Sequence, residues 1–158
     1  MKVPIIRPGV VRNAARILLV ILGWATSLAA ITLVGIFNGL LLPKGLGGLL
    51  PDVLGGSELG PLLLYLAMCG TSILASLLIR NLGVAFGSFL ASYCGSGIIT
   101  YFVLYLPALL GSYSSPEVLT EVSIRFTFFA LFPFPLLAGL LGTILGGIIA
   151  EMRGFCVV

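Results

Sequence analysis

Three serines stand four residues apart in one uncharged stretch of the sequence: Ser88, Ser92 and Ser96. This spacing places their side chains on one face of an α-helix, so the hydroxyl groups would form a single polar line. Such a line can donate hydrogen bonds to its own helix or to a neighbouring helix. The alternative is a polar path for a small neutral or weakly charged solute, because hydroxyl groups replace part of a solute's hydration shell.

Two prolines, Pro133 and Pro135, interrupt another uncharged stretch. Each lacks a backbone N–H and therefore frees a carbonyl group in a helix. Freed carbonyls can bind an ion or a permeant where they line a cavity, which would make this segment a gate. The simpler interpretation is a bend that fits the neighbouring helices.

Groups for catalysis or metal binding are scarce in this sequence. It has no histidine, and Cys69, Cys94 and Cys156 form neither a CxxC pair nor a zinc spacing. The long uncharged stretches also lack acids and bases that could transfer protons. We therefore expect no enzyme activity, no metal and no cofactor. Cys156 follows the last apolar stretch, where an unmodified tail is expected and lipidation is the alternative.

The composition decides which solvent suits the chain. Of its 158 residues, 59% are hydrophobic and 8% are charged, whereas about 25% are charged in an average soluble domain. Mean hydropathy is +1.24. The sequence predicts an integral membrane protein forming a single domain over residues 1–158. The net charge of +3 comes from scattered cations, so no nucleic-acid partner is expected.

Four apolar runs are long enough to cross a bilayer, since a span needs roughly 20 such residues. They cover residues 17–42, 61–79, 82–110 and 126–150. The segment 43–60 is rich in glycine and proline and predicts an external loop, with a re-entrant segment as the alternative. A helix should begin near Pro116, where Glu121 and Arg125 are spaced to pair. Pro133 and Pro135 should kink the fourth run.

Cations are distributed unequally about these runs. One side of the membrane would carry Lys2, Arg7, Arg12, Arg16, Arg80 and Arg153. The positive-inside rule then places both termini in the cytoplasm, as expected of a multi-pass protein of the cell membrane.

Small residues recur every four positions in two of the runs, where a soluble core helix would carry Leu and Ile. One line is Gly83, Gly87, Ala91 and Gly95, and the other is Ala138, Gly142, Gly146 and Ala150. Close backbone approach holds helices together in a membrane and requires such small side chains. The sequence thus predicts an all-α, polytopic four-helix bundle with tight small-residue packing.

Two functions from different classes fit these features. The first is a structural, accessory or assembly subunit, whose partners are copies of itself or other membrane subunits within the bilayer. The alternative is an oligomeric channel or transporter, with a solute passing along the serine line and gated at the two prolines. Because no fixed charge lies at mid-depth in the spans, the structural role is the main prediction.

Overall fold

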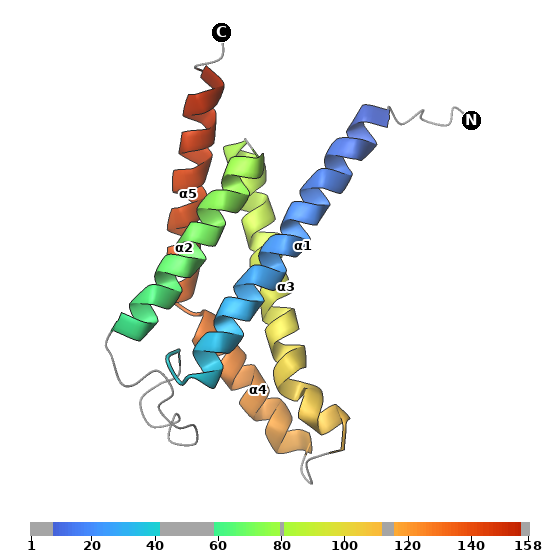
Figure 1. Ribbon diagram of the computed structural model, residues 1–158. Coiled ribbons are helices and arrows are strands. Elements are labelled where there is room, and N and C mark those ends of the chain that lie inside the picture. The colour runs from blue at the N-terminus through green and yellow to red at the C-terminus, as the bar shows by residue number, and fades with distance from the viewer. Residues whose placement is uncertain (1–7, 42–58, 80, 112–115, 156–158) are drawn as a thin grey trace, which may run out of the picture.

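Five helices make up the described part of the chain in a computed structural model, which describes residues 8–41, 59–79, 81–111 and 116–155 (Figure 1). They are α1 (Pro8–Phe37), α2 (Leu59–Ile79), α3 (Leu82–Leu109), α4 (Pro116–Leu131) and α5 (Phe134–Phe155). Four of them are long and apolar enough to cross a membrane, within Ala15–Phe37, Gly60–Ile79, Leu82–Leu109 and Phe134–Met152. The all-helical class is confirmed for the described residues, and so is the presence of four helices that are able to span a membrane. Most of the predicted loop 43–60 lies outside the described residues.

The four long helices form two closely packed pairs. α5 packs most extensively on α2, and α1 packs on α3. The start of α1 and the end of α5 lie at one end of the bundle, and α4 lies obliquely at the other end beside α3 (Figure 1). Four crossings of a membrane would bring the start of α1 and the end of α5 to the same side.

The surface of the bundle is apolar and its interior contains hydroxyl groups. Leu19, Leu74 and Leu110 are 70%, 65% and 72% exposed, as suits side chains that face lipid. Apart from the polar atoms of Trp24 and Tyr93, the buried polar side chains of the described chain all belong to serine or threonine. They are Thr32, Ser72, Ser76, Ser88, Ser92, Ser96, Thr100, Ser123 and Thr143. Short hydroxyl side chains allow close helix packing and can bond to helix carbonyls, so they suit this interior.

Aromatic rings fill the centre of the bundle between α1 and α3. Phe89 is completely buried, and its ring centroid lies 5.6 Å from that of Trp24 and 5.4 Å from that of Tyr93. Both pairs are tilted, and their centroid separations lie within the range of favourable aromatic contacts. A continuous aromatic contact therefore joins α1 to the middle of α3.

The first turn of α3 is held from two directions. Asn81 accepts a hydrogen bond from the N–H of Val84 at 3.0 Å, as an N-cap residue does. The carboxylate of Glu151, near the end of α5, accepts from the N–H of Leu82 at 3.3 Å. An acid is favourable at this positive helix end. The end of α5 is thereby fixed to the start of α3.

The fourth apolar run is broken more completely than the kink that the sequence predicts. α4 ends at Leu131 and α5 begins at Phe134, with Pro133 between them. The prolines end one helix and start another because neither can donate within a helical turn. Of the two helices, only α5 qualifies as a span. The expected ion pair is confirmed on α4. Nη2 of Arg125 lies 2.5 Å from Oε1 of Glu121, and both side chains are exposed.

Candidate functional site

The serine line of α3 lies on the buried face of that helix. Ser88 is 5% exposed, and Ser92 and Ser96 are completely buried. Ser92 donates a hydrogen bond to the carbonyl of Ile21 on α1 at 3.1 Å. Ser96 donates to the carbonyl of Tyr93 one turn earlier at 2.7 Å. Part of the line therefore joins α3 to α1, and the packing interpretation accounts for Ser92 directly.

Other buried hydroxyls have no hydrogen-bond partner within the described protein. They are those of Ser72, Ser76, Thr100 and Thr127. Buried polar groups normally have partners, so such groups call for an explanation. Ser72 and Ser76 stand one turn apart on α2, beside glycines of α5.

The small-residue line of α5 faces α2 inside the bundle. A side chain begins at Cβ, and a Cβ at Gly142 would collide with the backbone carbonyl of Cys69. At Gly146 it would lie 2.6 Å from the carbonyl oxygen of Ile73 and 2.8 Å from the Cβ of Ser76. Ala150 is also buried. These glycines let the two helix backbones touch, as close-packed membrane helices require.

The small-residue line of α3 points elsewhere. Gly83, Gly87 and Ala91 are exposed, and no atom lies within 4 Å of an ideal Cβ at Gly87. Gly95, the last residue of the line, faces α1 instead. An ideal Cβ at Gly95 would lie 3.3 Å from the Cβ of Ala25. We call Gly83, Gly87 and Ala91 the outer glycine face. Contacts within the described chain do not explain why Gly87 has no side chain.

Tyr93 is a buried polar residue that the sequence interpretation did not single out. Its hydroxyl donates to the carbonyl of Leu131, the last residue of α4. In a continuous helix the donor to that carbonyl would be the N–H of residue 135, which is proline and has none. The clue in the sequence is a tyrosine among small residues at mid-span, close to a helix broken by prolines. The bond ties α3 to the α4–α5 break.

The grooves on the surface of the described protein include three that bear on these residues. One, of about 470 Å³, lies between α1 and α2 and includes Arg16 and Trp24. A second, of about 520 Å³, lies between α3 and α4 and is almost wholly apolar. The third, of about 260 Å³, lies at the helix break and includes Pro133 and Pro135. Ser88, Ser92 and Ser96 line none of these three, so the serine line and the prolines do not meet in any of them.

Comparison of the chain with protein-family models, with curated proteins and with solved structures gives no match.

Proposed function

We propose that this protein is a structural or assembly subunit of the cell membrane, with both termini cytoplasmic, that contacts copies of itself or other membrane subunits through the outer glycine face. The observation that carries the proposal is the exposure of Gly83, Gly87 and Ala91 on α3. A glycine inside a helix costs about 1 kcal/mol relative to alanine. A position that faces only lipid would lose nothing by carrying a larger apolar side chain.

The inner and outer glycines differ in what surrounds them. Gly142 and Gly146 are buried against the backbone of α2, so packing within the chain accounts for them. At Gly87, by contrast, the space where a side chain would stand is empty. A partner helix at this position would gain the close backbone approach that stabilises membrane helix pairs. Cys94 is exposed one turn beyond Ala91 and offers a chemical probe of this face.

Replacing Gly87 with leucine is expected to disperse the assembly while leaving each subunit folded. Leucine fits in the monomer because the site is empty, but it would separate the backbones of two subunits. The measurement is mass by light scattering in mild detergent, with helix content by circular dichroism. Gly70→Leu is the matched control, since Gly70 on α2 also has no atom within 4 Å of an ideal Cβ.

Cysteine crosslinking gives an independent test of the same face. A protein whose only cysteine is Cys94 should form crosslinked dimers or adducts with a partner subunit in native membranes. One whose only cysteine is Cys69, which is half-buried on α2, should not. Assemblies that keep their mass in the Gly87→Leu protein would contradict the proposal, and so would equal crosslinking by both cysteines.

The second candidate is an oligomeric channel or transporter for a small neutral or weakly charged solute. The observation that favours it is the set of buried hydroxyls without partners, including Ser72, Ser76 and Thr100. A polar solute or water that entered the bundle would supply the missing hydrogen bonds. In this hypothesis the path follows Ser88, Ser92 and Ser96.

Ser92→Leu is expected to block solute flux into proteoliposomes, because it fills the proposed path and removes the bond to Ile21. Ser92→Ala removes the same bond without filling the path, so it separates blockage from loss of helix packing. Flux that survives Ser92→Leu, or no flux across a broad panel of neutral solutes, would exclude this path.

A further inference from the structure

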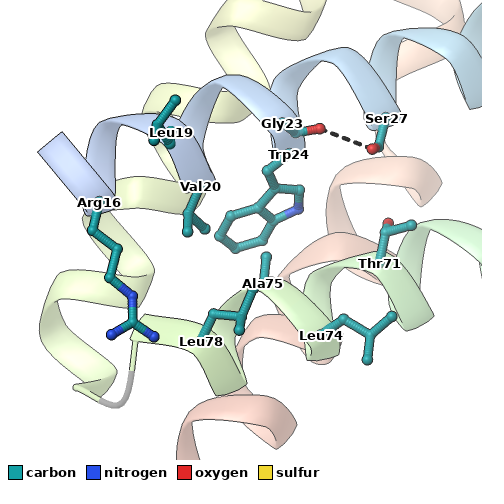
Figure 2. A pocket seen from close by; sticks show the side chains of 10 residues that line it. All are labelled: Arg16, Leu19, Val20, Gly23, Trp24, Ser27, Thr71, Leu74, Ala75 and Leu78. Carbon is teal, nitrogen blue, oxygen red and sulfur yellow. Dashed lines mark hydrogen bonds between the residues drawn. The ribbon is translucent and has the colours of Figure 1, made fainter.

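The groove between α1 and α2 has a cation, Arg16, at one end and a buried hydrogen-bond donor, the indole of Trp24, deeper inside (Figure 2). Its volume is about 470 Å³. Gly23 and Ser27 on α1, and Thr71 and Ala75 on α2, are pairs spaced four apart, so small side chains face the groove from both helices. Leucines of both helices add apolar walls. The groove is thus long and mostly apolar, and it opens on the side of the bundle that faces lipid.

Arg16 lies where this groove reaches the membrane interface. It is the second residue of the candidate span Ala15–Phe37, so it stands near one edge of the hydrocarbon layer. Its side chain is exposed and lines the groove, and no acidic side chain of the described chain pairs with it. An unpaired cation at this depth attracts the phosphates of lipid head groups.

Trp24 supplies the second, independent feature. Its side chain is 3% exposed, and its indole N–H has no hydrogen-bond acceptor within the described protein. The indole nitrogen lies on the side of the ring that faces Ser27 and Thr71 (Figure 2). Both of those hydroxyls donate to carbonyls of their own helices, at 2.8 Å and 2.9 Å. An indole N–H is a donor only, so a buried one normally has an acceptor.

We propose that this groove binds one anionic glycerophospholipid, with its phosphate at Arg16, an ester carbonyl available to the N–H of Trp24 and an acyl chain along the apolar walls. A glycerophospholipid combines the three chemistries that the groove presents: an anion, hydrogen-bond acceptors and a long apolar chain. The bilayer supplies this ligand at high local concentration. The proposal concerns α1 and α2 and is independent of the outer glycine face on α3.

Trp24 is also a built-in reporter, because it is the only tryptophan among the 158 residues. The experiment reconstitutes the full chain in phosphatidylcholine vesicles that contain a brominated phospholipid, which quenches tryptophan fluorescence on contact. Brominated phosphatidylglycerol should quench Trp24 at an about fivefold lower mole fraction than brominated phosphatidylcholine, since one cation near the surface has about this effect on anionic lipid.

Two substitutions test the groove itself. Arg16→Gln should remove the preference for the anionic lipid, whereas Arg125→Gln, which removes an exposed cation of α4 paired with Glu121, should retain it. Gly23→Leu should also remove it, because an ideal Cβ at Gly23 meets nothing within 4 Å and the added side chain would occupy the groove. Circular dichroism checks that each variant keeps its helices.

Several outcomes would overturn the proposal. Equal quenching by the two lipids in the unaltered protein would mean that the groove does not select an anion. A preference that persists in Arg16→Gln or in Gly23→Leu would place the lipid elsewhere. Displacement of the brominated lipid by inorganic phosphate would indicate a site for a free anion. Loss of an oligomer in Gly23→Leu, without any lipid preference, would assign the groove to a second copy of the chain.

Discussion

Replacing Gly142 with leucine is expected to lower the free energy of unfolding by about 3 kcal/mol or more, because the new side chain has no room between α5 and α2. Even its Cβ would collide with the backbone carbonyl of Cys69 and lie 2.9 Å from the Cβ of Ser72. A backbone carbonyl cannot rotate away as the end of a flexible side chain can. The two helices must therefore separate, and the pair with the most extensive contact in the bundle is lost.

The measurement is an unfolding titration from mild detergent into a denaturing one, followed by circular dichroism. Replacement with alanine tests whether a small added side chain raises or lowers the free energy of unfolding. In an ordinary helix, Gly→Ala is favourable by about 1 kcal/mol. We expect Gly142→Ala to destabilise the protein, and Gly87→Ala, at an empty position, to leave the subunit as stable as before or more so. A Gly142→Leu protein as stable as Gly70→Leu would contradict the packing seen between α2 and α5.

The number of candidate spans could be predicted from the sequence because length and apolarity alone decide whether a helix can cross a bilayer, although the fourth begins at Phe134 and not at residue 126. The predicted run 82–110 and the observed α3, Leu82–Leu109, differ by one residue. At this level no knowledge of neighbouring helices is needed. The side of the membrane on which the termini lie stays a prediction, since it depends on charge distribution and not on packing.

The inward and outward faces of α3 could not be predicted in the same way. The sequence shows both the glycine line and the serine line, each with its residues spaced four apart. In a soluble protein the more polar line would face water, but lipid and the protein interior are equally apolar, so that criterion fails in a membrane. The structure places Ser92 inside and Gly87 outside. The positions of the helices packed against α3, chiefly α1, α5 and α4, decide which face is buried.

The groove between α1 and α2 was also beyond the sequence interpretation. In the sequence alone, Arg16 belongs to the cations that predict the orientation, and Trp24 is one aromatic residue within an apolar run. Their relation depends on α2, a separate helix that supplies Thr71 and Ala75. A sequence shows spacing within one helix, whereas a groove requires the register of two.

The extent of the break at Pro133 depends on a partner that sequence spacing does not reveal. Proline predicts a bend, but a full break leaves the last carbonyls of α4 without donors. In a membrane such carbonyls must be satisfied by the protein. Tyr93 of α3 supplies the donor for Leu131, so the break becomes tolerable. The tyrosine and the prolines are therefore expected to act as one structural unit.

Replacing Tyr93 with phenylalanine is accordingly expected to cost about 1.5 kcal/mol, more than an average hydrogen bond between membrane helices. The ring stays in place against Phe89 and Phe132, so packing changes little. What is lost is the only hydroxyl that bonds to the Leu131 carbonyl among the described residues. A buried acceptor left without a donor costs more than the bond itself contributes.

The same unfolding titration measures this effect, with Tyr101→Phe as the matched control. Tyr101 also lies on α3, but it is only half-buried and its ring stacks on Tyr105. Its hydroxyl should be replaceable at little cost. Hydrogen exchange gives a local readout: amides at the start of α5, such as that of Leu137, which donates to the Pro133 carbonyl at 3.2 Å, should exchange faster in Tyr93→Phe. Equal stability of the two variants, with unchanged exchange at Leu137, would show that the α4–α5 break holds without Tyr93.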